Sequence, residues 1–269
     1  MSELPYNTVE VLAMTPSNFR QIVRQNRWPE MAINCCRGYT QANLVILPSE
    51  MAGEFLLFCQ RNPKPCPVLD VTERGSPHPI LLAPEADLRT DLGKYRVFKE
   101  GKLIDEPTDI IKYWRDDLVA FMIGCSLSFD WSLRANNILY RMPGDYYTNI
   151  QCIPAGRFHG HMVVSCRIIE GSHNAIRAIQ LSSRYPSMHG ALIGIGDPKG
   201  LGIKDFCHPE FAVGTDPITL PKPTEIALYW ACGITPQIVA VEAEVPFMIT
   251  HYCGYMFVTD KPAEDFTVI

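Results

Sequence analysis

Several signals that would identify a class of function are missing from this sequence of 269 residues. No apolar run reaches the ~18 uninterrupted residues of a membrane-spanning helix, so we expect no membrane partner. The 24 Lys and Arg residues are outnumbered by 29 Asp and Glu residues. Because a nucleic-acid partner needs a basic face, we expect none. Residues 1–16 have neither the basic end nor the apolar centre of a signal peptide, and we expect a cytoplasmic protein.

Metal and disulfide patterns are also scarce. None of the ten cysteines form the CxxC spacing of zinc ribbons or thioredoxin-like sites, and we interpret most of them as small buried apolar residues. His159 and His161 would point to the same side of a strand, and with His173, His208 or an aspartate they offer a zinc set. No HExxH pattern joins them, and we favour solvated loop histidines. We therefore expect no metal and no redox cofactor.

Two glycine-containing stretches lack the motifs they suggest. Gly194, Gly196, Gly200 and Gly202 are not followed by the Lys and Ser or Thr of a P-loop, and we interpret them as turn glycines. The stretch that begins "GCSLS" fails the G-x-S-x-G pattern of serine hydrolases because position 128 is serine.

What is present indicates a packed core of short elements. The chain is 47% apolar and contains 22 prolines and 18 glycines. "TPSNFRQIVRQN" predicts a helix with Thr15 as its cap, and a second helix is predicted from Ser49, as its cap, to the proline at 63. Residues 68–71 predict a strand, and 94–105 predict a hairpin.

The segment 107–133 joins an apolar run to a small, polar, sulfur-bearing one. The helical spacing of its apolar residues predicts a helix that ends at Gly124, followed by a second helix near 127–137. Ser126 or Ser128 would cap the second helix. Alternatively, its free N–H groups would hold a carboxylate or an oxyanion, and Cys125 would gain thiolate character.

The pattern of predicted strands and helices changes near residue 143. Strands are predicted at 161–171, 189–198 and 225–233, and helices at 172–186 and from Thr235, again as a cap, to 245. Residues 246–260 predict strand, turn and strand. We expect an α/β fold with a three-layer α/β core formed by 1–142 and 222–269. Residues 143–221 would form a smaller α+β two-layer domain.

Eight stretches together resemble the D-glutamate cyclase family of hydro-lyases, in consistent order along nearly the whole chain. They are "RGYTQANLVILP" (37–48), "FCQRNPKPCPVLDV" (58–71), "ADLRTDLGKYRV" (86–97), "RDDLVAFMIGCSLSFDWSL" (115–133), "PAGRFHGHMVVSCR" (154–167), "IGDPKGLGI" (195–203), "YWACGITPQ" (229–237) and "ITHYCGYMFVTD" (249–260). The resemblance implies an α/β core with an inserted α+β domain. It also implies a hydro-lyase that acts on a small amino or hydroxy acid.

The chain departs from the family at two positions where relatives usually carry histidine, here Gly194 and Tyr255. These departures motivate a second hypothesis, in which the protein is a non-catalytic carboxylate-binding or regulatory member. The oligomeric state stays open, with a homodimer as one alternative.

Cyclisation of glutamate defines the groups to look for. The α-carboxylate of the substrate needs an anchor, and Arg37 with Gln41 and Asn43 offers a guanidinium and two amides in one short stretch. A surface ion pair of Arg37 is the alternative. With Ser128 and Thr250, these residues are the predicted binding set for a small-molecule carboxylate.

Proton transfer and stabilisation of the intermediate need a second set. The predicted catalytic residues are His251, His189, Ser126, Cys125 and Asp197. A structural role for each histidine is the alternative. Cys125 as a nucleophile lacks a histidine beside it in the sequence.

Overall fold

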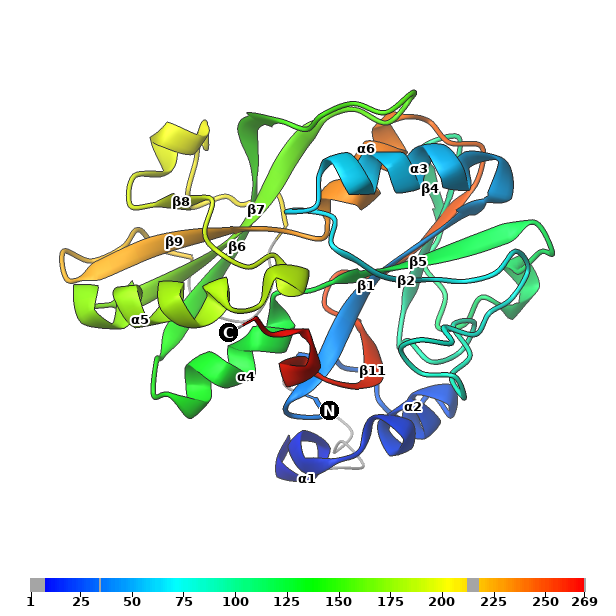
Figure 1. Cartoon of the computed structure of the whole chain (residues 1–269), viewed down its shortest axis with the longest axis horizontal. Helices are drawn as coiled ribbons and strands as arrows, with labels where there is room; N and C mark the ends of the chain where they lie inside the picture. Colours follow the sequence, from blue (N-terminus) through cyan, green and yellow to red (C-terminus); the bar gives the residue numbers. More distant parts are fainter. Residues whose placement is uncertain (1–7, 34, 212–217, 269) are drawn as a thin grey trace.

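The computed structural model describes residues 8–33, 35–211 and 218–268, whose strands form two antiparallel sheets (Figure 1). The larger sheet has the order β2-β5-β1-β10-β3-β4, and β11 also pairs with β1. Its strands are β1 (Tyr39–Pro48), β2 (Val68–Val71), β3 (Tyr95–Lys99), β4 (Lys102–Asp105), β5 (Leu118–Gly124), β10 (Met248–His251) and β11 (Phe257–Pro262). The smaller sheet has the order β6-β7-β9-β8, from β6 (Tyr140–Gln151), β7 (His161–Glu170), β8 (Gly194–Ile195) and β9 (Glu225–Ala231).

The described residues form six α-helices beside the sheets, and this mixture confirms the α/β class. They are α1 (Thr8–Ala13), α2 (Pro16–Arg24), α3 (Ser49–Arg61), α4 (Leu127–Ala135), α5 (Ser172–Ser183) and α6 (Thr235–Glu242). Within the described ranges, each helix is too short or too polar to cross a membrane.

Strand β1 is the centre of the larger sheet. It pairs with β5 from Ala42 to Pro48, and its other edge is shared by β10 and β11. Every residue of β1 after Tyr39 is buried. The apolar run "LVIL" therefore faces protein on both sides of the sheet, as expected of a central strand.

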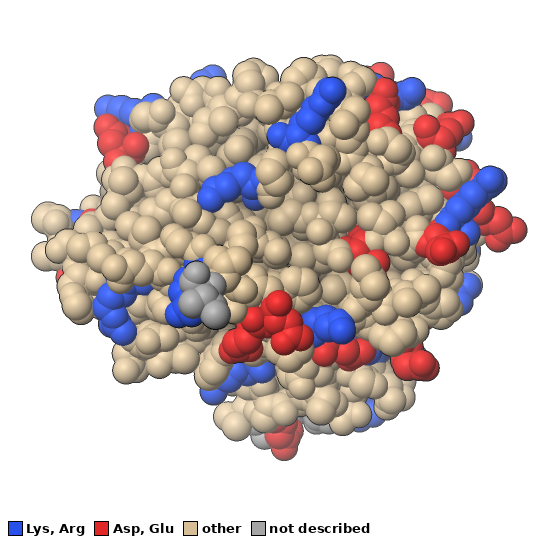
Figure 2. Space-filling view, viewed as in Figure 1, with Lys and Arg blue, Asp and Glu red and all other residues tan. Residues whose placement is uncertain are grey.

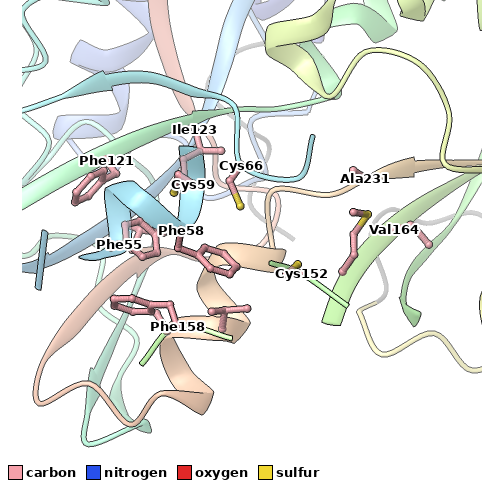
Figure 3. Packing of buried hydrophobic residues seen from close by; sticks show 14 of the residues in the cluster. Phe55, Phe58, Cys59, Cys66, Phe121, Ile123, Cys152, Phe158, Val164 and Ala231 are labelled. Atoms are coloured by element: carbon pink, nitrogen blue, oxygen red, sulfur yellow. The ribbon is translucent and has the colours of Figure 1, made fainter. Parts of the chain in front are cut away.

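One apolar cluster joins the two sheets. Phe55 of α3 packs edge-to-face against Phe121 of β5 at 4.9 Å and against Phe158 at 5.2 Å, and Phe58 lies 6.4 Å from Phe158 (Figure 3). The same cluster includes apolar side chains of β7 and β9, such as Val164. The two sheets are thus parts of one packed interior.

Different segments of the chain pack on the remaining faces of the two sheets. Buried leucines from the irregular segment 72–94 pack on the larger sheet, and α4 and α5 pack on the smaller one. Strand β9, which follows the proposed insert, pairs with β7 in the smaller sheet. The three-layer core and the boundaries of an inserted domain stay predictions.

The prediction of a helix that ends at Gly124 is wrong. Residues 118–124 form strand β5, buried along its whole length between β1 and β2. Only a short 3-10 turn, Ile111–Tyr113, precedes it, and Ile111 is exposed. A strand buried on both faces is uniformly apolar, so its side chains also match a helical spacing. The second helix is confirmed as α4.

Three of the predicted helix caps also need correction, whereas Thr15 caps α2 as predicted, accepting from the N–H of Asn18 at 3.4 Å. Helix α3 has Pro48 at its cap position, and the N–H of Ser49 donates to the carbonyl of Asp117. The hydroxyl of Thr235 accepts from the N–H of Val163 at 3.0 Å instead of capping α6. Neither serine caps α4, as described below. For Thr235 and the two serines of α4, a hydrogen bond to a neighbouring strand replaces the local one.

The cysteine prediction is confirmed. All ten are free thiols and seven of them are buried, with the remaining three partly buried. On the face shown in Figure 2, acidic and basic side chains are intermingled around an uncharged centre, without a continuous basic field.

Candidate functional site

A recess opens where the two sheets meet, and we call it the inter-sheet recess. Strands β1 and β10 contribute Asn43 and His251, and β6 and β7 contribute Asp145 and Ser165. The turn between β5 and α4 and the turn between β9 and α6 complete it. These turns carry the remaining sulfur and hydroxyl groups: Cys125, Ser126 and Cys232, with Cys253 after β10.

The turn after β5 is held by close backbone packing. A Cβ on Gly124 would lie 1.8 Å from the carbonyl oxygen of Ser187, so a side chain has no room there. The amide of Asn43 donates to the carbonyl oxygens of Ile123 and Gly124, at 3.3 and 3.0 Å. The strand therefore ends at the recess and α4 begins there.

The turn after β9 repeats this arrangement. Cys232 follows the strand, and α6 begins three residues later. A Cβ on Gly233 would lie 2.0 Å from the amide nitrogen of Asn43, so this turn packs directly on β1. The amino ends of α4 and α6 both border the recess, and both favour negative charge.

Asp145 is the most unusual ionisable group of the recess. Its side chain is 2% exposed, and its Oδ1 has no hydrogen-bond partner within the described chain. Burial raises the pKa of Asp145 to about 7, against a smaller opposing effect of Arg167. The carboxyl group therefore gains and loses a proton near neutral pH, which suits a general acid or base.

His251 is neutral and its tautomer is fixed. Burial lowers the pKa of His251 to about 4. Its Nδ1 accepts from the N–H of Leu44 at 3.1 Å, and the amide nitrogen of Gln237 also lies 3.1 Å from Nδ1. The single ring proton must then sit on Nε2. His251 can donate a hydrogen bond at neutral pH but is a poor base.

Behind the recess lies a buried ion pair. The guanidinium of Arg167 contacts Asp130 at 2.7 Å and is enclosed by the rings of Phe129, Tyr140 and Trp230, with centroids 5.1, 5.5 and 5.1 Å away. It also donates to the hydroxyl of Ser126 at 3.0 Å. Because this hydroxyl accepts from Arg167, its own hydrogen is free to point elsewhere.

The thiols of the recess are protonated. Burial raises the pKa of Cys125 to about 12 and that of Cys253 to about 12, and it raises the pKa of Cys232 as well. A thiol in this state is a weak nucleophile. The nucleophilic role of Cys125 stays a prediction that these surroundings do not favour.

A second recess lies on the other side of Leu127, and we call it the Arg37 recess. Its lining includes Arg37, Gln41 and Ser128, with Asp130, Trp131 and Arg134 from α4. The hydroxyl of Ser128 accepts from the backbone N–H of Gln41 at 2.9 Å and lies 3.2 Å from its carbonyl oxygen. These bonds attach the first turn of α4 to β1.

The predicted site residues therefore form two groups. Arg37, Gln41 and Ser128 meet in the Arg37 recess, and four others meet in the inter-sheet recess: Asn43, Cys125, Ser126 and His251. Leu127 lines both recesses, so the two groups are neighbours.

Three predicted residues line neither recess. His189 is buried with its Nδ1 2.9 Å from the carbonyl of Lys64. Asp197 caps a short 3-10 turn by accepting from the N–H of Lys199 at 2.9 Å. The hydroxyl of Thr250 donates to the carbonyl of His251. Each has a structural hydrogen-bond partner, although Nε2 of His189 is buried without one among the described residues.

Asp145 and Arg167 were missed by the sequence reasoning. Each is a charged residue in the interior of a strand with no charged neighbour directly beside it, within "PGDYY" of β6 and "VSCRII" of β7. The available signal was this isolation, because a charge flanked by apolar residues in a buried strand needs a partner or a function.

The histidine pair at 159 and 161 shows no metal site. His161 contacts the side-chain amide of Gln151 on the neighbouring strand. In the part of the chain that the structure describes, no three His, Cys, Asp or Glu side chains gather as metal ligands.

The chain is similar in sequence to one protein family and to several of its members. The model of the family described as D-glutamate cyclase matches residues 119–260. "Putative hydro-lyase GK2103" of Geobacillus kaustophilus is 51% identical over 262 residues, which cover 95% of this chain and 98% of that protein. "Putative hydro-lyase YcsI" of Bacillus subtilis is 46% identical over 262 residues, 95% of this chain and 100% of that protein. The crystal structure of a nitrogen repressor-like protein from Methanococcus jannaschii aligns over 92% of this chain and 99% of that chain, with 9% identity and a TM-score of 0.38.

Proposed function

This chain belongs to the D-glutamate cyclase family, and from that membership we propose that it is a hydro-lyase acting on a small amino or hydroxy acid. D-Glutamate, which would lose water to form 5-oxoproline, is the first substrate to test. We place the reaction in the inter-sheet recess. The reaction needs no electron transfer, and we propose that it proceeds without a redox cofactor.

The single observation that carries the proposal is the buried carboxyl group of Asp145. In the cyclisation, the amine nitrogen forms a bond to the far carboxyl carbon, and one C–O bond of that carboxyl breaks. Two protons leave the ammonium nitrogen and two join the departing oxygen, which becomes water. A group whose pKa lies at about 7 can carry each proton in turn and finish in its starting state.

Two neutral donors support the tetrahedral intermediate in this scheme. The Nε2–H of His251 is available because Nδ1 already accepts from Leu44. The hydroxyl hydrogen of Ser126 is available because its oxygen accepts from Arg167. Both would donate to the oxygen on which negative charge develops.

The decisive experiment compares wild type with Asp145→Asn. Formation of 5-oxoproline from D-glutamate, followed by chromatography, is expected in wild type and lost in Asp145→Asn, while the exposed-carboxylate control Asp205→Asn retains it. A panel of other amino and hydroxy acids is assayed in parallel for dehydration. Absence of product from every acid, with folded wild-type protein, would refute the hydro-lyase proposal.

The alternative function is a carboxylate-binding or regulatory protein without catalysis. It rests on the absence of histidine at positions 194 and 255. Neither position lines the inter-sheet recess, and the hydroxyl of Tyr255 donates to the carbonyl of Pro29 at 2.7 Å. Binding of D-glutamate in calorimetry without turnover, together with turnover in a Gly194→His, Tyr255→His double variant, would favour the alternative.

A further inference from the structure

The Arg37 recess contains a guanidinium that forms no ion pair with the described residues, because Asp130, the carboxylate in the described lining, is already paired with Arg167. Arg37 stacks over the ring of Trp131, 5.1 Å from its centroid. Arg134, on the same helix as Trp131, lines the recess as well and stacks over Tyr140 at 5.1 Å. Stacking fixes the plane of a guanidinium and leaves its N–H groups available at the edge.

An unused acceptor lies in the same recess. Gln41 is 3% exposed, and its amide nitrogen donates to the carbonyls of Ala32 at 2.9 Å and Cys35 at 3.4 Å. These two bonds use both amide hydrogens, so the orientation of the amide is determined. The oxygen Oε1 is left buried without a partner. A buried acceptor of this kind is expected to receive a hydrogen bond from water or from a ligand.

The inter-sheet recess has no comparable cation. Arg167, the basic residue behind it, is fully buried and paired with Asp130. A carboxylate placed beside Asp145 would therefore lack an unpaired positive partner within the described lining. A guanidinium without an ion pair does lie on the other side of Leu127, in the Arg37 recess.

We propose that the Arg37 recess is a binding site for a small carboxylate that carries a neighbouring amino or hydroxyl group. Arg37 receives the carboxylate through its paired N–H groups, and Oε1 of Gln41 accepts from the amino or hydroxyl group. The pair of contacts selects an amino or hydroxy acid over a simple carboxylic acid, because the simple acid leaves the buried oxygen unpaired.

The site is connected to the inter-sheet recess through the start of α4. Ser128 bonds to both backbone groups of Gln41, and Leu127, one residue earlier, lines both recesses. The carboxylate can thus come from the substrate of the proposed reaction, held at one end, or from a second molecule whose binding shifts α4. The chemistry of recognition is the same in both cases.

Calorimetric titration of the full chain tests the site. D-Glutamate is compared with glutarate, which lacks only the amino group, on wild type, Arg37→Met, Arg37→Lys and the control Arg74→Met, an exposed arginine outside both recesses. We expect D-glutamate to bind wild type and Arg74→Met equally. Arg37→Met is expected to bind roughly 10- to 100-fold more weakly, with partial recovery in Arg37→Lys. Glutarate is expected to bind more weakly than D-glutamate.

The stoichiometry distinguishes the two sources of the carboxylate. One D-glutamate per chain, with a raised KM in Arg37→Met, identifies the substrate's own carboxylate. Two per chain in wild type and one in Arg37→Met identify a second molecule. Binding that depends on Arg37 without any turnover supports the site and contradicts the proposed hydro-lyase. Equal binding to Arg37→Met and Arg74→Met, or no binding to wild type, overturns the site.

Discussion

Nη2 of Arg167 lies 3.0 Å from the hydroxyl oxygen of Ser126 and 2.7 Å from Oδ1 of Asp130. One buried guanidinium thus fixes a hydroxyl at the wall of the inter-sheet recess and a carboxylate in the first turn of α4. The ion pair is neutral as a whole, so it orients Ser126 without adding net charge to the recess.

Ser126→Ala tests this orientation. The variant removes a donor from the proposed intermediate, and we expect kcat to fall by about 100- to 1000-fold, the effect of losing one oxyanion donor. Arg167 keeps its bonds to Asp130, so the free energy of unfolding should fall by only ~1 kcal/mol. Steady-state kinetics and urea unfolding measure the two effects. An unchanged kcat would remove Ser126 from the mechanism.

The pH dependence of the reaction should report Asp145. Asp145 must first accept a proton from the ammonium nitrogen, so the free enzyme needs its ionised form, and burial raises the pKa of Asp145 to about 7. We therefore expect kcat/KM to rise as the pH rises through about 7. The measurement is a profile from pH 5.5 to 9 with D-glutamate. A flat profile over this range would argue against Asp145 as the proton carrier.

Ser128→Ala should loosen α4 from β1. The substitution leaves the N–H and carbonyl of Gln41 without their partner on α4, in a buried position. We expect the free energy of unfolding to fall by ~1–3 kcal/mol in urea titration. Ser132→Ala, on the same helix but only half-buried, is the control and should change stability by less than ~0.5 kcal/mol. Equal stability of the two variants would contradict the importance of these bonds.

Gly124→Ala should be strongly destabilising. Its Cβ would lie 1.8 Å from a backbone oxygen of Ser187, which cannot move away as a side chain could. We expect a loss of at least ~3 kcal/mol of unfolding free energy, or insoluble protein. Gly53→Ala is the control, because its Cβ meets nothing within 4 Å in α3 and should stabilise by ~0.5–1 kcal/mol. Normal stability of Gly124→Ala would mean that the backbone at Ser187 can move away to make room for the added Cβ.

His189→Asn should change the acid stability of the fold. Burial lowers the pKa of His189 to about 4, so the folded protein keeps this ring neutral while the unfolded chain protonates it near pH 6.5. Wild type therefore loses stability as the pH falls from 6.5 toward 4. The variant has no ring to protonate and should not show this pH-dependent loss of stability. Asn also tolerates the left-handed backbone at position 189, where φ is 73°. Urea titrations at pH 7 and 5 should show a smaller drop for the variant by about 2 kcal/mol. Identical drops would show that His189 does not titrate as inferred.

The sequence predicted the elements whose ends carry local signals. Thr15 and Pro16 mark the start of α2, and the hairpin β3–β4 turns at Glu100 and Gly101. β5 was mistaken for a helix because a strand buried on both faces shows no alternation. β5 is a strand because it pairs with β1, some 75 positions earlier in the chain. The residues near β5 in the sequence give no sign of this pairing.

The candidate site was predicted in part for the same reason. Residues near motifs, such as Ser126 and His251, do line the inter-sheet recess. Asp145 was missed because its importance comes from burial and from an unpaired oxygen, which depend on β6 and its neighbours. The separation of Arg37 from Cys125 by Leu127 is likewise a property of packing.

The position of β1 in the larger sheet has a consequence for synthesis of the chain. β1 ends at Pro48, whereas its partners β10 and β11 lie within residues 248–262, some 200 positions later. The edge of β1 that they cover must therefore stay unpaired until these residues have been synthesised. Nascent chains stalled between β1 and residue 248 should for this reason bind chaperones that recognise exposed apolar segments, and chains that include β10 and β11 should not.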